Sequence, residues 1–216
     1  NVSGLQLTDA AGVRLLADID FKLRAGEIVA IAGVSGNGQS ELLQILSGMR
    51  LPTSGKVEFL GSDLPYAKRG DADGLPKVFR ELGIAHIPED RLRDGVIKDF
   101  SVMQNTVFGY QDRVRNKMGL FDFEAIAKRC AHLLEAFDVR PKNPDLRIGL
   151  LSGGNQQKVV IAREVSASPR VINAARALCP NSSPSLAPAA MASTFFTAPP
   201  TSTPARSAAI FRPPMR

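Results

Sequence analysis

The sequence is poor in several features, and each shortage excludes a class of protein. It has two cysteines, Cys130 and Cys179, which lie far apart and lack the spacing of metal ligands. This usage is typical of a reduced cytosolic protein rather than a disulfide-rich one. No stretch approaches 18 uncharged apolar residues, so no segment is predicted to span a membrane. No basic-then-apolar leader follows Asn1, and we expect no secretory signal.

Acidic residues, lysine and histidine are all absent beyond Glu164. The five arginines in that segment belong to the 27 basic residues of the chain, which leaves 22 basic against 21 acidic residues before it. The net charge of +6 is therefore a property of the tail, where the arginines are spread from Arg170 to Arg216. Nucleic-acid binding needs a clustered basic surface, so we expect no nucleic-acid partner.

Residues 1–168 show the patterns of an α/β domain. Short apolar or alternating runs predict strands, and apolar stripes that follow capping residues predict helices. The strands are expected at 2–7, 19–23, 28–32, 56–60 and 84–87. The helices are expected at 40–47, closed by Gly48, and after the N-caps Ser101, Asp122 and Ser152.

Residues 169–216 have a different composition. This segment holds nine prolines and no glycine, and prolines at that density break helices and remove donors from sheets. Val171 and Ile172 begin a strand that Asn173 is expected to interrupt. We therefore predict a domain over 1–168 and a Pro/Ala/Ser-rich tail over 169–216 that lacks regular structure.

A glycine-rich loop follows the apolar run at 28–32. A buried strand that turns through glycines into a helix surrounds an anion with backbone amides at a helix N-terminus. The pattern is that of a phosphate loop, except that Gln39 stands in place of the lysine. Without that lysine, such a turn also occurs as a purely structural element. The predicted nucleotide-binding residues are Gly33, Ser35, Gly36, Asn37, Gly38, Gln39, Ser40 and Glu41, with Ser40 as the Mg²⁺ ligand.

A second glycine motif opens the helix that Ser152 caps. The Ser152 hydroxyl and the amides that follow it form another anion site at a helix start. The motif resembles the signature sequence of ABC-type ATPases, and its distance from the first loop is the one found in that family. The resemblance implies that the motif closes over the γ-phosphate of ATP held by a partner domain. The predicted signature residues are Leu151, Ser152, Gly153, Gly154, Asn155 and Gln156.

A third stretch narrows the resemblance. Residues 84–91, Asp94-Gly95 and 101–105 are similar to the second nucleotide-binding domain of fused sugar or nucleoside importer ATPases, over roughly residues 1–170. The resemblance implies a P-loop NTPase fold with a helical signature subdomain at about 86–160, and ATP and Mg²⁺ as cofactors. It also implies a second nucleotide-binding domain and membrane permease subunits as partners. The expected location is cytoplasmic, peripheral on the inner face of the cell membrane.

The chain departs from that family at four places. Gln39 supplies no ammonium for the phosphates, residues 9–13 contain no aromatic to stack on adenine, and Glu89 replaces the glutamine that senses Mg²⁺ and the membrane partner. No Asp, Glu or His follows Glu164, so the metal ligand and the base of the family have no counterpart. His86 and His132 precede the signature and are interpreted as surface or packing residues. We therefore assign no catalytic residue and expect no ATP hydrolysis by this chain alone.

Two other interpretations stay open. The chain is a non-catalytic regulatory module in the first, where nucleotide binding only stabilises a dimer. It is an inactive product of a frameshift near codon 170 in the second, because a Pro/Ala/Ser/Thr/Arg-rich tail without acids is typical of GC-rich DNA read out of frame. In that case the C-terminal part of the fold is truncated or scrambled.

Overall fold

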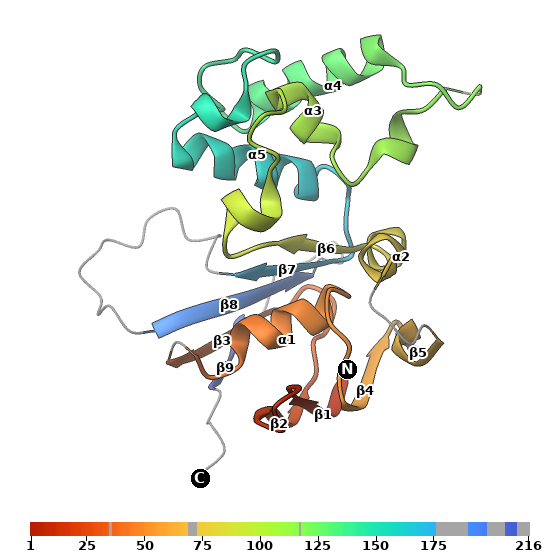
Figure 1. The fold of residues 1–216 in the computed structure, drawn as a ribbon, viewed down its shortest axis with the longest axis vertical. Coiled ribbons are helices and arrows are strands. Elements are labelled where there is room, and N and C mark those ends of the chain that lie inside the picture. The colour runs from red at the N-terminus through yellow and green to blue at the C-terminus, as the bar shows by residue number, and fades with distance from the viewer. Residues whose placement is uncertain (35, 69–72, 117, 176–189, 198–205, 211–216) are drawn as a thin grey trace. The chain divides into compact units, whose positions relative to one another are not determined.

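The chain forms two compact units, which are drawn as ribbons in Figure 1. The computed structural model describes residues 1–34, 36–68, 73–116, 118–175, 190–197 and 206–210. The first unit combines Asn1–His86 with Pro169–Arg216, and the second unit consists of Ile87–Ser168. The second unit spans the region where the sequence predicts the helical signature subdomain.

Two sheets build the first unit. One has the strand order β2-β1-β4-β5, and the other has the order β6-β7-β8-β3-β9. The bounds are β1 Val2–Thr8, β2 Arg14–Phe21, β4 Ser54–Phe59 and β5 Ser62–Asp63 in the first sheet, and β3 Ile28–Val34, β6 Ile84–Ile87, β7 Val171–Ala175, β8 Ala190–Thr197 and β9 Arg206–Ile210 in the second. Strands far apart in sequence, such as β6 and β7, are thus neighbours (Figure 1).

The second strand begins earlier than the sequence predicts. The expected strand covers 19–23, whereas β2 spans Arg14–Phe21. Asp18 has a positive φ of 46°, and the register of β1 against β2 shifts between the pairs Leu5–Ile19 and Leu7–Leu16. The alternation of side chains between the two faces of the sheet is therefore broken at this irregularity. A period-2 pattern therefore finds only the second half of the strand.

The segment after Pro169 contains strands that the sequence analysis does not predict. β7 continues through Asn173 to Ala175, so the expected interruption at Asn173 is wrong. β8 pairs antiparallel with both β3 and β7, and β9 pairs parallel with β3. The segments that form β8 and β9 contain no proline. The high proline content of the whole tail therefore does not exclude strands at these two places. The domain boundary at 168 and the frameshift stay predictions.

Helix α1 (Gln39–Leu46) packs between the sheets of the first unit, and its predicted end is confirmed by a left-handed Gly48 with φ 76°. Helix α2 (Leu75–Leu82) is not predicted by the sequence analysis, although Pro76 lies at its first turn, where proline is favoured. A short 3₁₀ helix, η1, spans Pro65–Lys68. The largest side chains buried in this core include Leu5, Leu16, Leu42, Ile45, Leu75 and Phe79.

Helices dominate the second unit. Its α-helices are α3 Val102–Val107, α4 Phe123–Ala136 and α5 Gly153–Val165, and its shorter helices are η2 Arg91–Gly95, η3 Gln111–Val114 and η4 Ile148–Leu150. The three predicted N-caps are confirmed: the side chains of Ser101, Asp122 and Ser152 accept hydrogen bonds from backbone N–H groups at 3.1, 2.9 and 3.5 Å. Ser101 also forms a capping box with Gln104.

A buried polar network holds these helices together. The guanidinium of Arg163 donates to the carboxylate of Glu164 at 2.9 Å, and the two side chains are only 5% and 6% exposed. Tyr110 donates its hydroxyl to the other oxygen of Glu164 at 2.6 Å. Arg163 also donates to the carbonyl oxygens of Gly95 and Asn105 at 3.0 and 3.3 Å. The Glu164 charge is thereby paired and hydrogen-bonded, which a buried carboxylate requires.

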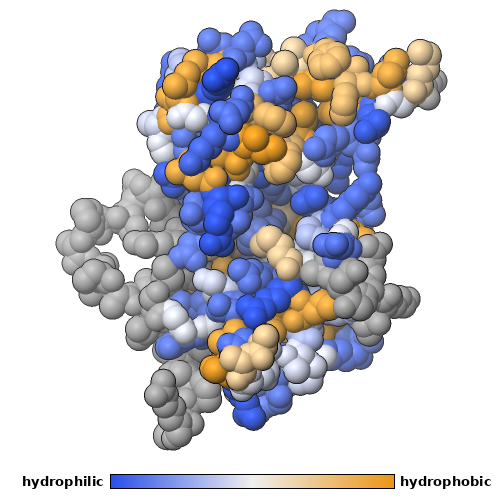
Figure 2. Space-filling view, in the orientation of Figure 1, coloured by the Kyte–Doolittle hydropathy of each residue, from blue (hydrophilic) through white to orange (hydrophobic). Residues whose placement is uncertain are grey.

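The chain segment that leads into the first turn of α4 exposes an apolar patch. We define this apolar patch as Met118, Leu120, Phe121 and Phe123, which are 78%, 60%, 41% and 68% exposed. Figure 2 shows hydrophobic surface at this end of the second unit. Among the described residues, no helix has both the length and the apolar character needed to cross a membrane.

Candidate functional site

The predicted phosphate loop is a strand–loop–helix connection in the first unit. β3 leads into α1 through four residues, of which Ser35 lies outside the described residues. Gly36 and Gly38 have φ values of 89° and 86°, which glycine adopts without strain. Leu42 donates its N–H to the carbonyl oxygen of Gly38 at 2.9 Å, so Gly38 is the N-cap of α1. Amides of a first helical turn lie outside the hydrogen-bond ladder of their helix, so they can meet an anion there.

The two left-handed glycines have different surroundings. A Cβ on Gly38 would lie 2.6 Å from the carbonyl oxygen of Leu15 and 2.6 Å from Cδ2 of Leu16. A Cβ on Gly36 would meet nothing within 4 Å. Gly38 thus closes the loop onto β2, whereas Gly36 leaves open space in which a phosphate can approach the backbone.

The other predicted nucleotide-binding residues belong to the same connection. Gly33 lies in β3, Asn37 lies in the loop, and Gln39, Ser40 and Glu41 form the first turn of α1. Gln39 is only 6% exposed, while Ser40 and Glu41 are half-buried. The backbone therefore gathers these residues at one helix N-terminus. Their contacts with a nucleotide stay a prediction.

The predicted signature residues form the start of α5 in the second unit. The Ser152 hydroxyl accepts from the side-chain amide of Asn155 at 3.0 Å as well as from its backbone N–H. Leu151 and Gln156 are buried, and Gln156 donates to the carbonyl oxygens of Ile148 and Leu151 at 3.2 and 2.9 Å. Gly154 is exposed, with nothing within 4 Å of a Cβ built on it. The helix start is thus open at Gly154.

Arg91 lies against this helix start, which the sequence analysis did not foresee. A Cβ on Gly153 would come within 2.3 Å of Nη2 of Arg91. The buried Nε of Arg91 has no hydrogen-bond partner among the described residues. A cation beside the positive end of a helix is unfavourable unless an anion joins it. The signal in the sequence is weak, because Arg91 and Gly153 lie far apart and only the fold brings them together.

Glu89, the residue in the predicted glutamine position, is exposed just after β6. The next residue, Asp90, caps η2 by accepting from the N–H groups of Leu92 and Arg93 at 2.9 and 3.2 Å. Glu89 therefore stands at a point where the chain turns from a strand into a capped helix, with its carboxylate at the surface. Its predicted contact with Mg²⁺ is untested.

The end of β7 carries no acidic side chain. Ala174 and Ala175 close the strand and are buried, where the family resemblance implies an aspartate for Mg²⁺. Among the described residues, no group of three or more His, Cys, Asp or Glu side chains is placed to hold a metal ion. These side chains therefore form no metal site of their own, and the Ser40 hydroxyl as a ligand of Mg²⁺ carried by a nucleotide stays a prediction.

Comparison with known protein sequences identifies the family. The sequence profile of the ABC transporter family matches residues 16–174. The guanosine import ATP-binding protein NupO of Bacillus subtilis is 34% identical over 176 residues, which cover 81% of this chain and 33% of that protein. The glucose import ATP-binding protein TsgD13 of Haloferax volcanii is 39% identical over 169 residues, which cover 76% and 29%. The chain spans about a third of the length of these curated relatives.

Solved structures show the same fold. The dimeric bacterial ABC transporter cassette MJ0796 is 25% identical, with a TM-score of 0.66, and the match covers 80% of this chain and 72% of that one. The protein cbiO1 from Clostridium perfringens, part of an ABC transporter complex, is 26% identical with a TM-score of 0.59, and the match covers 79% and 62%. With the profile extending across the phosphate loop, the signature helix and most of β7, the chain belongs to the ABC transporter family and has the fold of its ATP-binding cassette.

Proposed function

We propose that this chain is the ATP-binding part of an ABC importer for sugars or nucleosides, equivalent to the second nucleotide-binding half of a fused subunit. The observation that carries the proposal is the β3–loop–α1 connection, with left-handed Gly36 and Gly38 at an open helix N-terminus. Relatives that import guanosine, glucose and ribose support the substrate class. The permease and binding protein, rather than this chain, would choose the cargo.

In this proposal, different residues of the loop bind different parts of Mg-ATP. The amides of the first turn of α1 receive the phosphate oxygens, and the Ser40 hydroxyl faces the metal carried by the nucleotide. Gln39 offers no positive charge to the β- and γ-phosphates. A charge-assisted hydrogen bond contributes about 1.5–3 kcal/mol, so affinity is expected to be roughly ten- to a hundredfold below that of a lysine-bearing loop.

The signature helix would serve a partner domain. Ser152, Gly153 and Gly154 offer a hydroxyl and helix-start amides, and Arg91 adds a positive charge beside them. We propose that this combined site receives the γ-phosphate of a nucleotide held on the other domain. In the same proposal, the apolar patch of the second unit supports docking to a membrane permease at the cytoplasmic face.

Hydrolysis is not part of the proposed function of the chain alone. No Asp, Glu or His follows Glu164 in the sequence, and β7 ends in two alanines. This observation favours the second candidate function, a regulatory module that binds nucleotide without turning it over. An inactive frameshifted product would share the missing turnover but is expected to lose nucleotide binding as well.

Gln39→Lys tests the proposed function. The substitution is expected to tighten Mg-ATP binding at least tenfold while turnover stays at background, because the phosphates gain a cation but no base or metal carboxylate. Since Gln39 is 6% exposed, the new ammonium is partly desolvated without nucleotide, so ATP should also stabilise this variant more than the wild type. Isothermal titration calorimetry, phosphate release and thermal melts measure these effects.

Gln44→Lys is the matched control for that experiment. Gln44 lies on the same helix, in the turn after the loop, and is half-buried. A lysine there is expected to leave ATP affinity unchanged. Equal ATP affinities of the Gln39→Lys and Gln44→Lys variants would contradict the phosphate-loop assignment, and ATP turnover by the purified wild-type chain would contradict the missing-carboxylate argument.

Arg91→Ala tests the proposed signature site. In an equimolar mixture with the Gln39→Lys chain, Mg-ATP should promote association, because one chain supplies the phosphate loop and the other the signature. The substitution is expected to weaken that association about tenfold with little change in melting temperature. Arg93→Ala is the control, since Arg93 is exposed and paired with Asp94 at 3.0 Å. Sedimentation velocity measures the association, and equal behaviour of the two variants would exclude a role for Arg91.

A further inference from the structure

The first unit contains a cavity that the proposed function does not use. Its volume is about 370 Å³, which is within the range of small-molecule sites. The walls are mainly apolar and come from both sheets and from α1. The side chains that form most of the wall are Val2, Phe21, Leu46, Val57, Phe59 and Ile84.

One polar side chain in the wall has an unsatisfied atom. Asn173 in β7 is 1% exposed and lines the cavity on the same face of the strand as Val171. Its Nδ2 donates to the carbonyl oxygen of Leu43 at 3.0 Å. Its Oδ1 is buried and accepts no hydrogen bond from any described residue. Buried acceptors are rarely left in this state. This oxygen has almost no surface open to the cavity, so a donor there would reach it only after the Asn173 amide turns toward the cavity.

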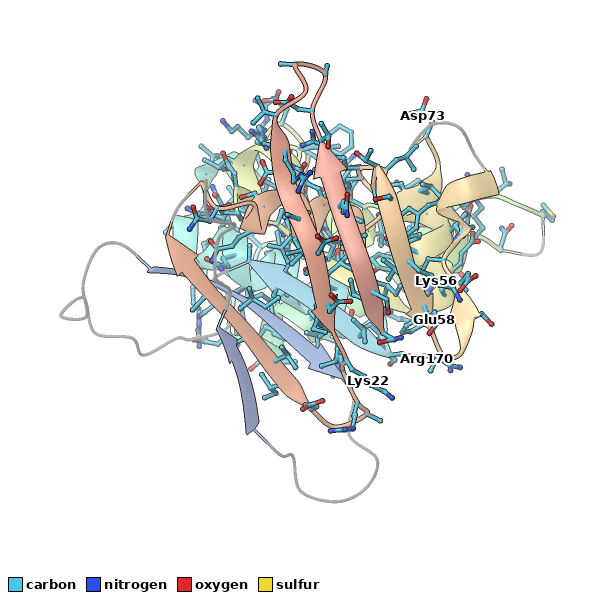
Figure 3. All side chains as sticks on the ribbon, turned by 90° about the horizontal axis from the view of Figure 1, so that it is seen from below. Lys22, Lys56, Glu58, Asp73 and Arg170 are labelled. Atoms are coloured by element: carbon cyan, nitrogen blue, oxygen red, sulfur yellow. The ribbon has the colours of Figure 1, made fainter. Side chains whose placement is uncertain are left out.

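The cavity also carries a positive charge in its lining. Arg170 lines it, and no described residue forms an ion pair with the Arg170 guanidinium. Glu58 also lines the cavity, but its carboxylate pairs with Lys56 at 2.7 Å and accepts from Nδ2 of Asn1 at 3.1 Å. The hydrogen bond from Lys56 lowers the pKa of Glu58. Figure 3 shows Arg170, Glu58 and Lys22 along one side of this unit.

We propose that this cavity binds a small amphipathic organic anion. An apolar ring would fill the space between the sheets, and a carboxylate would meet the guanidinium of Arg170. One N–H or O–H of the ring would donate to Oδ1 of Asn173, whose amide would turn toward the cavity on binding. Asn173 follows Arg170 by three residues, which is roughly 10 Å along an extended chain. The ligand therefore carries its donor and its charge at opposite ends, and the site is independent of nucleotide binding.

Indole-3-butyrate is a suitable probe, because a three-carbon chain separates its carboxylate from the indole ring that carries the N–H. The full chain contains no tryptophan, so the fluorescence of the indole ring can be followed without a tryptophan background. Titration of the probe with wild-type chain is expected to shift its emission to shorter wavelength and to saturate. The N-methylated analogue, which lacks the donor, should bind about tenfold more weakly, as should the corresponding alcohol, which lacks the charge.

Two variants assign the contacts. Asn173→Leu should bind the N–H and N-methyl probes with equal affinity, because the acceptor is gone. Arg170→Gln should bind the acid and the alcohol equally, and this exposed substitution keeps the test valid if Asn173→Leu fails to fold. Arg14→Gln is the control, since Arg14 is exposed on β2 and does not line the cavity. Absence of saturable binding to the wild type at millimolar probe, or discrimination that survives both substitutions, would overturn the proposal.

Discussion

Gly38→Ala is expected to lower the free energy of unfolding of the first unit by about 2–5 kcal/mol. A left-handed φ costs a residue with a Cβ about 1–2 kcal/mol, and forcing a methyl group into a packed place costs about 1–3 kcal/mol more. The Cβ would lie 2.6 Å from the carbonyl oxygen of Leu15. Because that atom belongs to the backbone of β2, it cannot move aside as a flexible side chain does. Urea denaturation followed by far-UV circular dichroism measures the loss, and Mg-ATP binding should fall with it.

Gly36→Ala separates the cost of the left-handed backbone conformation from the cost of the close contact with β2. Gly36 has nearly the same φ as Gly38 but nothing within 4 Å of its Cβ position, so only the conformational cost of about 1–2 kcal/mol applies. The difference between the two alanine variants therefore reports the contact with β2. If both variants lost the same free energy of unfolding, the close approach of the loop to β2 would be refuted.

Arg163→Met is expected to destabilise the second unit by about 3–5 kcal/mol. The substitution keeps the length and apolar stem of the side chain but removes the partner of the Glu164 carboxylate, which is 6% exposed. In this variant the hydroxyl of Tyr110 still donates a hydrogen bond to the carboxylate, but it brings no positive charge. A buried charge without its counter-charge is costly, so much of the loss should be recovered in the double variant Arg163→Met, Glu164→Gln. Denaturant unfolding of the three proteins measures both effects.

The pair Lys128–Glu124 on α4 is the matched control. Its ammonium and carboxylate lie 2.6 Å apart, but the side chains are 75% and 79% exposed. Lys128→Ala is expected to change the free energy of unfolding by no more than about 0.5 kcal/mol, because water and salt screen a surface pair. A similar loss for Arg163→Met and Lys128→Ala would mean that the network around Glu164 contributes nothing through its burial.

Local patterns predicted the parts of the fold that depend on a few neighbouring residues. Ser101, Asp122 and Ser152 each cap a helix as expected, because a side chain that accepts from an amide two or three residues later needs no other part of the chain. The glycine loop was found for the same reason. β2 was found only in part, since the irregularity at Asp18 depends on pairing with β1.

The features that the sequence did not reveal depend on contacts between distant segments. Asn173 was expected to interrupt a strand, because a polar residue in an apolar run gives no sign of its partner. In the structure that partner is the carbonyl oxygen of Leu43, 130 residues away in the chain. Arg91 and Gly153 meet in the same way. The candidate residues of the phosphate loop and the signature could therefore be predicted from the sequence. The positions of Arg91 beside the signature helix and of Asn173 against Leu43 could not.

Contacts within the first unit hold helix α1 at both ends. Its C-terminal half is held from three directions: Tyr66 donates its hydroxyl to the Ile45 carbonyl oxygen at 2.7 Å, Asn173 reaches Leu43, and Gly48 abuts the backbone of Leu75. The opposite end is held as well, because its N-cap Gly38 packs closely against the carbonyl group of Leu15 in β2. With both ends fixed by contacts within the first unit, the amides of the first turn of α1 are expected to keep their directions before an anion arrives, so that little ordering of this helix would accompany binding.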